Sequence, residues 1–306
     1  MHDHDSHEHG HSHAAVHNFG PIFAIATALN LALVLVQVFY GVVAQSVALL
    51  ADAGHNFGDA LGLLIAWGAY VLGKFKPTAR YTYGFRSASI LAAVLNGVIL
   101  LVATGAIAWE AIGRLFEPRE VAGATVMIVA AVGVVINGFS ASLLMMGQRG
   151  DLNIRGAFLH LAADAAVSFG VVVAGGLILL TGWNWLDPAL SITISAVIVW
   201  GTWSLLREAI NQSLDAVPVE IDPNEVAGFL NNLPGVESIH DLHIWAMSIA
   251  ETALTCHLVM PKGHPGDDFL QKLCEELHDK FEIEHPTVQI ELADAANCKL
   301  APEHVV

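Results

Sequence analysis

Charged residues are scarce in this chain of 306 residues, and basic residues are the scarcer kind. Only 14% of the residues are charged, whereas soluble domains carry about 25%. Hydrophobic residues make up 55% of the chain and its mean hydropathy is +0.57, so the composition predicts a membrane protein. The 29 acidic residues outnumber the 13 basic ones, which argues against nucleic acid as a partner and fits a protein that handles cations.

Cysteine is also rare, and the N-terminus lacks the pattern of a secretion signal. Cys256, Cys274 and Cys298 are scattered with no Cys-x-x-Cys motif, which argues against a disulfide framework. Residues 1–13 have neither the basic nor the apolar region of a signal peptide.

The first 17 residues form a low-complexity tract with seven histidines and no apolar periodicity. This pattern predicts a disordered, His-rich cytosolic tail over residues 1–17. The tract contains HExxH from His7 to His11, but a protease zinc site needs that spacing on a buried helix. We therefore interpret the match as chance. Weak gathering of metal and simple solubilisation are both open as roles of the tail.

Six apolar segments follow, each long enough for the roughly 20 residues that cross a bilayer. They predict a six-helix transmembrane domain over residues 18–213, with spans at about 19–41, 46–73, 87–113, 121–147, 156–181 and 186–207. On one side, the connections carry seven basic residues: Lys74, Lys76, Arg80, Arg86, Arg149, Arg155 and Arg207. On the other side they carry only Arg114 and Arg119. Because basic residues favour the cytoplasmic side, we expect both termini in the cytoplasm.

Beyond the last apolar segment, the composition becomes that of a small soluble domain, expected at residues 214–306. Asp222 and Pro223 begin a helix that runs to about residue 232. Apolar alternation predicts strands at 236–247 and 251–260, then an amphipathic helix at 267–281 and a third strand at 287–292. The expected fold class is therefore an α-helical membrane protein with a C-terminal α+β domain of order αββαβ.

Two His-x-x-x-Asp pairs stand inside apolar segments, His55 with Asp59 and His160 with Asp164. Residues four apart share one face of a helix, and ionisable groups at membrane depth are costly, so each pair suggests a function. Two imidazoles and two carboxylates supply the four ligands that zinc prefers, with cadmium or cobalt tolerated. The alternative is that each pair makes structural hydrogen bonds between helices.

Release of a bound ion can be driven by protons, since imidazole and carboxylate ligands must be deprotonated to hold a metal. This competition predicts an antiporter that exchanges a divalent metal for protons. Asp52 lies three residues before His55 on the same helical face, nearer the outer surface. It is a candidate carboxylate of the release path, and pairing or facing water near the interface is the alternative.

The chain resembles the cation diffusion facilitators, on the branch that transports zinc. The resemblance rests on SVALLADAGHNFGD at 46–59, YTYGF at 81–85, the pair in the fifth span, and DLHIW at 241–245. It implies a homodimer in a bacterial inner (cytoplasmic) membrane, with six membrane helices and a metallochaperone-like cytosolic domain. It also implies proton-driven zinc efflux through His55, Asp59, His160 and Asp164. No cofactor is expected, zinc being transported and held as a regulatory ion.

The same resemblance suggests a second metal site in the soluble domain, at His240, His257 and Glu291, with Cys298 as a further thiolate ligand. Ordinary surface histidines are the alternative. Some relatives bind metal between spans two and three, but residues 74–86 contain no His, Asp or Glu, so we expect none there. We also expect an ion pair between the two domains, from Arg86 to Asp215.

Two other classes of function compete with the antiporter. A membrane-tethered zinc sensor would bind zinc without moving it. A metal-dependent membrane hydrolase would need an open coordination position and a general base, and four protein ligands leave neither. The sequence therefore favours a transporter that is not an enzyme.

Overall fold

The structure, a computed structural model, describes residues 20–144, 152–292, 298 and 300. Six long helices come first: α1 (Gly20–Val43), α2 (Val47–Gly73), α3 (Ala88–Phe116), α4 (Gly123–Leu144), α5 (Leu152–Thr181) and α6 (Leu186–Ser213). They coincide with the six predicted segments to within a few residues at most ends. Among the described residues, α3, α4, α5 and α6 contain stretches that are long and apolar enough to cross a membrane. The predicted His-rich tail lies outside the described residues.

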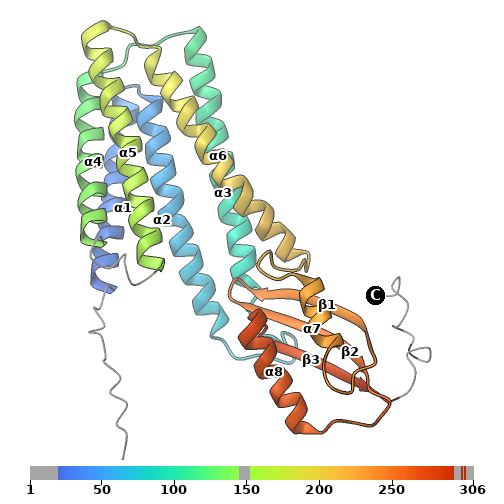
Figure 1. Ribbon diagram of the computed structural model, residues 1–306. Coiled ribbons are helices and arrows are strands. Elements are labelled where there is room, and N and C mark those ends of the chain that lie inside the picture. The colour runs from blue at the N-terminus through green and yellow to red at the C-terminus, as the bar shows by residue number, and fades with distance from the viewer. Residues whose placement is uncertain (1–19, 145–151, 293–297, 299, 301–306) are drawn as a thin grey trace, which may run out of the picture.

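The helices form two groups (Figure 1). One contains α1, α2, α4 and α5, and α3 runs beside α6 in the other. The close approach of α4 and α5 depends on small residues, since a Cβ added to Gly175 would lie 2.8 Å from the backbone nitrogen of Met127. Helix α2 runs toward the C-terminal sheet and α5 runs away from it, so the two are antiparallel.

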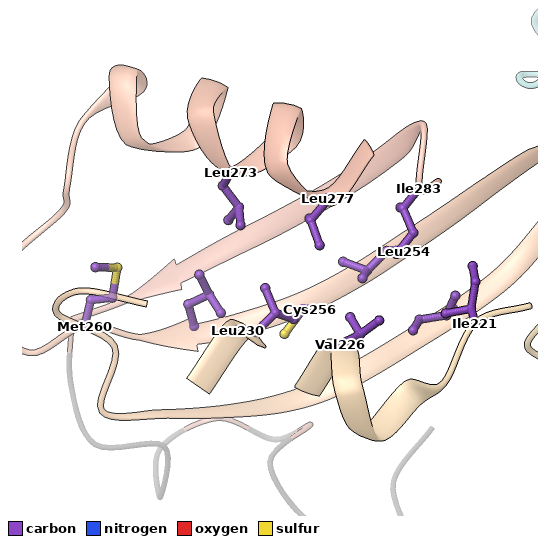
Figure 2. Close-up of a cluster of buried hydrophobic side chains, with 11 residues drawn as sticks. Ile221, Val226, Leu230, Leu254, Cys256, Met260, Leu273, Leu277 and Ile283 are labelled. Carbon is purple, nitrogen blue, oxygen red and sulfur yellow. The ribbon is translucent and has the colours of Figure 1, made fainter. Parts of the chain in front are cut away.

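The C-terminal part contains α7 (Pro223–Asn231), β1 (Ser238–Ser248), β2 (Glu251–Val259), α8 (Asp267–Phe281) and β3 (His285–Glu291). The predicted αββαβ order is therefore confirmed. Strand β2 is central, antiparallel to β1 and parallel to β3. Figure 2 shows the core, where α7 contributes Val226 and Leu230, β2 contributes Leu254 and Cys256, and α8 contributes Leu273 and Leu277. The apolar faces predicted from helical and strand periodicity thus meet in one cluster.

The connection between α2 and α3 lies against the turn between β1 and β2. Ser87 Oγ donates a hydrogen bond to the Met247 carbonyl at 3.2 Å, and the Ile249 amide donates to Ser89 Oγ at 3.1 Å. Arg86 Nη1 lies 3.0 Å from Glu251 Oε2. The predicted pairing of Arg86 with Asp215 was therefore wrong about the acid. Asp215 follows the end of α6, whereas the strand turn brings Glu251 to Arg86.

Candidate metal centres

The side chains of His55, Asp59, His160 and Asp164 converge between α2 and α5. His55 Nε2 lies 3.2 Å from Asp164 Oδ1 and 3.7 Å from Asp59 Oδ2. His160 Nε2 lies 3.3 Å from Asp59 Oδ2 and 3.5 Å from Asp164 Oδ2. Each histidine is thus close to the acid on its own helix and to the acid on the facing helix.

These distances suit a tetrahedral metal. Bonds of about 2.0–2.2 Å to nitrogen and oxygen give a tetrahedron whose edges are about 3.3–3.6 Å long. The four distances from histidine nitrogen to carboxylate oxygen, 3.2 to 3.7 Å, are close to that range. His55, Asp59 and Asp164 each place one such atom within 4.8 Å of the other two. His160 is outside that group of three and meets Asp164 through its Oδ2, whereas His55 meets Asp164 through Oδ1. The donor set, two nitrogens and two oxygens, fits zinc.

A cavity of about 850 Å³ adjoins this cluster between α2, α3, α5 and α6. His55, Asp59 and His160 are part of its lining, and the lining continues along α6 to Glu208 and Gln212 near the C-terminal end of that helix. The Asp164 side chain is 3% exposed, whereas that of His160 is 45% exposed. The cluster is therefore open toward the cavity on the His160 side, and Asp164 is shielded.

Asp52 does not face the surface, although it was a candidate for a release path. It is fully buried and belongs to a polar cluster of α1, α2 and α5. Gln37 Nε2 donates to Asp52 Oδ2 at 2.6 Å, and Ser168 Oγ donates to the same oxygen at 3.0 Å. Asn56 donates in turn to Gln37 Oε1 at 3.3 Å. Sequence reasoning missed Gln37 and Ser168, which lie 15 and 116 residues from Asp52.

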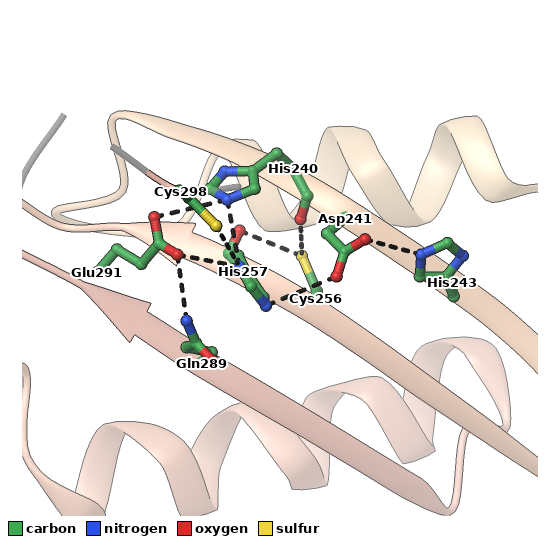
Figure 3. Close-up of polar contacts among 8 residues, drawn as sticks. All are labelled: His240, Asp241, His243, Cys256, His257, Gln289, Glu291 and Cys298. Atoms are coloured by element: carbon green, nitrogen blue, oxygen red, sulfur yellow. Dashed lines mark hydrogen bonds and ion pairs between the residues drawn. The ribbon is translucent and has the colours of Figure 1, made fainter. Parts of the chain in front are cut away.

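A second cluster lies on the sheet of the C-terminal part (Figure 3). His257 Nδ1 lies 3.2 Å from His240 Nε2, 3.0 Å from Glu291 Oε1 and 3.6 Å from Cys298 Sγ. All four residues offer ligand atoms within 4.8 Å of one another. The strand register explains why three of these side chains lie together. His240 of β1 pairs with His257 of β2, and Glu291 ends β3, which neighbours β2. Two imidazoles, a carboxylate and a thiol are a donor set that zinc accepts.

Charge within this cluster favours an ionised carboxylate at Glu291. Burial raises the pKa of Glu291, but the hydrogen bond from Cys298 and the positive charge of His240 and His257 outweigh it and hold this pKa below its usual value. Cys256 is a different case. Burial, with a smaller contribution from the negative charge of Asp241, raises the pKa of its thiol to about 12. Cys256 therefore stays protonated in the core at neutral pH and is no candidate ligand.

Asp241 is a further residue of this region that sequence reasoning missed as a site residue. The β1–β2 register shifts between His240 and His243, and Asp241 takes a left-handed backbone conformation with φ of 54°. Such a bulge redirects side chains. Asp241 Oδ2 lies 3.6 Å from Nε2 of His257, and Oδ1 lies 2.9 Å from His243. Asp241 thus approaches the ring atom of His257 that points away from the other three cluster residues.

Comparison with known proteins finds a match for each of the two parts of the chain. Residues 23–212 match the family model of the cation efflux transmembrane domain, and residues 218–293 match that of the cation efflux protein cytoplasmic domain. The chain belongs to the cation diffusion facilitator family. Membership in this family makes it a membrane transporter of metal cations and not an enzyme.

Two relatives illustrate the extent of similarity. The chain is 36% identical to the metal cation efflux system protein CzcD of Cupriavidus metallidurans, over 93% of this chain and 90% of the relative. It is 35% identical to the zinc transporter ZitB of Escherichia coli, over 94% of this chain and 92% of the relative.

A third relative and a solved structure complete the comparison. The cadmium, cobalt and zinc/H(+)-K(+) antiporter of Bacillus velezensis is 33% identical, over 93% of this chain and 92% of the relative. The solved metal-bound C-terminal domain of CzcD from C. metallidurans is 42% identical over 24% of this chain and all of that chain, with a TM-score of 0.22.

Proposed function

We propose that this protein exports zinc across a bacterial inner membrane in exchange for protons, through a site of His55, Asp59, His160 and Asp164. The observation that carries the proposal is the convergence of these four side chains between α2 and α5, with each histidine Nε2 3.2 to 3.7 Å from a carboxylate oxygen of both acids. Four protein ligands leave no open position for chemistry on a substrate, which favours carriage of the ion over hydrolysis.

In this proposal all six helices of residues 18–213 span the membrane and both termini are cytoplasmic. The excess of basic residues in the connections on the sheet side supports that orientation. The cavity that reaches Glu208 and Gln212 then offers cytosolic zinc a route to the four ligands. Protons displace the ion because they compete for the same nitrogen and oxygen atoms.

The choice of zinc, with cadmium and cobalt as further cargo, rests on the ligand set and on the relatives. Nitrogen and carboxylate ligands in a four-coordinate site suit these ions better than magnesium or calcium, which favour more oxygen ligands. The relatives are named for zinc in one case and for cadmium, cobalt and zinc in another. The name of the latter also supports the exchange for protons.

We propose in addition that residues 214–306 form a regulatory and dimerisation domain, with a metal held by His240, His257, Glu291 and Cys298. The mutual distances of these four residues support the site. Metal that binds one conformation of the homodimer better than another shifts the population toward it. The domain would thus adjust transport to the cytosolic zinc concentration.

Proteoliposome flux tests the transport site. Purified wild-type protein should move zinc and dissipate an imposed pH gradient at the same time. Asp164→Ala removes a buried ligand that approaches both histidines, so zinc flux should fall to the background of protein-free vesicles. Asp279→Ala, the same change at an exposed position of α8, should leave flux unchanged.

Each alternative has its own outcome in this assay. Zinc binding by the wild type without zinc or proton movement would favour the membrane-tethered sensor. Wild-type flux in Asp164→Ala would remove the four-residue site from the proposal.

A further inference from the structure

The polar cluster at Asp52 lies one helical turn from the four residues of the proposed transport site and on the same two helices. Asp52 precedes His55 by three residues on α2, and Ser168 follows Asp164 by four residues on α5. With a rise of 1.5 Å per residue, these steps are about 4.5 Å along α2 and about 6 Å along α5. Because α2 runs toward the sheet and α5 away from it, the Asp52 cluster lies on the side of the metal site that faces away from the sheet (Figure 1).

The hydrogen bonds of Asp52 are confined to one of its two carboxyl oxygens. Gln37 and Ser168 both donate to Oδ2. Oδ1 is buried and has no hydrogen-bond partner among the described residues. An ionised carboxylate with one oxygen unsatisfied is costly in a dry interior, and a proton on that oxygen removes the charge. The arrangement therefore suits a carboxyl group that is protonated for part of the transport cycle.

We propose that Asp52 is a proton-binding site of the exchange, separate from the metal ligands. This inference rests on the proposed function. Asp52 holds a proton on Oδ1 while the transport site is free of metal. A divalent ion one turn away favours the anion through its charge, so the O–H bond breaks when the ion binds. The proton passes to the water of the cavity beside the metal ligands, and Asp52 takes up another proton when the ion leaves.

Few charged groups lie near Asp52. Binding or loss of the ion at the proposed metal site is therefore the main change of charge in its surroundings. The charged groups that act on Asp52 are His55 of its own helix and Asp164 of α5, and both belong to the proposed metal site. The described residues of α1 and α4 carry no Asp, Glu, Lys, Arg or His. Asp187 of α6, like Glu110 and Arg114 of α3, lies at the end of its helix away from the sheet.

Helix α4 packs against the Asp52 cluster through Gly133. A Cβ added to Gly133 would lie 2.9 Å from Ser168 Oγ and 3.5 Å from Gln37 Nε2. The groups that bind Asp52 are therefore packed closely on this side, which keeps bulk water from satisfying the carboxylate. Protonation is then the means by which this group responds to the metal.

Proton release on zinc binding distinguishes this role from a structural one. It is measured by isothermal titration of the full-length protein in buffers of different ionisation enthalpy. Asp52→Asn keeps the size and one acceptor of the side chain but cannot ionise. The wild type should release up to about one proton more per zinc ion than this variant within the range of about pH 5 to 8. The wild type and the variant have the same metal ligands at both sites, so the protons that those ligands release cancel in the comparison.

Ser168→Ala provides a second and independent test. The variant keeps the carboxyl group but loses a donor that favours its anion, so the additional proton should be released at a pH about one unit higher than in the wild type. Equal proton numbers for wild type and Asp52→Asn, or an unshifted profile for Ser168→Ala, would overturn the proposal. Neither result affects the proposed function, which is tested separately by the zinc and proton flux of wild-type and Asp164→Ala liposomes.

Discussion

Asp241 shows how a residue outside the proposed ligand set shapes a metal site. Its carboxylate faces Nε2 of His257, while Nδ1 of the same ring faces His240, Glu291 and Cys298. A carboxylate on the far nitrogen of a ligand histidine orients the ring and increases its basicity. At 3.6 Å from Nε2, the charge of Asp241 favours a proton on that nitrogen, which would leave Nδ1 free for a metal.

Removal of this carboxylate should therefore weaken metal binding while the fold persists. We expect Asp241→Ala to lower the zinc affinity of the cytosolic site about 10- to 100-fold, the range typical of such supporting residues. The measurement is zinc titration of full-length protein in an Asp164→Ala background, which removes binding at the membrane site. His243→Ala, which removes the other partner of Asp241, should cost much less. Equal losses in both variants would mean that Asp241 acts through the strand and not through His257.

Helix α2 is held at its first turn by a residue of α6. Asp187 is buried and accepts hydrogen bonds from Ser46 Oγ and from the backbone amides of Val47 and Ala48. Ser46 Oγ accepts in turn from the Leu49 amide. A carboxylate at a helix N-terminus satisfies amides that have no partner within the helix and matches the helix dipole. Because α2 carries His55 and Asp59, this contact sets the position of two proposed ligands relative to α6.

Loss of the Asp187 contact should reduce both stability and transport. Asp187→Ala leaves buried amides unpaired, at a cost of about 1–3 kcal/mol, so the Tm of the detergent-solubilised protein should fall and zinc flux should slow. Asp222→Ala is the matched control, because Asp222 caps the short helix α7 by accepting from the Asn224 amide. It should cost about 1 kcal/mol without changing flux at temperatures well below Tm. Similar flux in the two variants would exclude a positioning role for Asp187.

Periodicity predicted the helices and the pairing within each, since residues four apart share a face whatever surrounds the helix. It accounts for His55 with Asp59 and for His160 with Asp164. It could not predict which faces meet, so Gln37 and Ser168 around Asp52 were missed. Asp241 was missed for a local reason, because a regular strand has no bulge. The error over Arg86 had the same cause as the omission of Gln37 and Ser168, since its acid, Glu251, is distant in sequence.

In the molecule as a whole, the connection between α2 and α3 links the two candidate metal clusters. Helix α2 carries His55 and Asp59, and the connection after it contacts the turn between β1 and β2, the strands that carry His240 and His257. Tyr83 of the connection also meets His285 of β3, with ring centroids 5.6 Å apart. If metal binding shifts the sheet, the movement therefore has a direct mechanical route to two of the proposed membrane ligands.

The Arg86–Glu251 ion pair tests this route by charge reversal. Both side chains are more than a third exposed, so the pair itself contributes at most about 1 kcal/mol. Arg86→Glu or Glu251→Arg should leave Tm nearly unchanged. Each should raise the zinc concentration for half-maximal flux by up to about fivefold, the equivalent of 1 kcal/mol, because like charges push the turn from the connection. The double reversal should restore the wild-type value.

A background of His240→Ala and His257→Ala separates coupling from local disturbance. Without the cytosolic cluster, zinc has no site from which to move the sheet. Arg86→Glu should then change the zinc concentration for half-maximal flux very little. If the single reversals act equally with and without the cluster, the pair only positions α3. If the double reversal fails to restore the wild-type value, the contact at Ser87 and Ser89 transmits the movement and the ion pair is incidental to it.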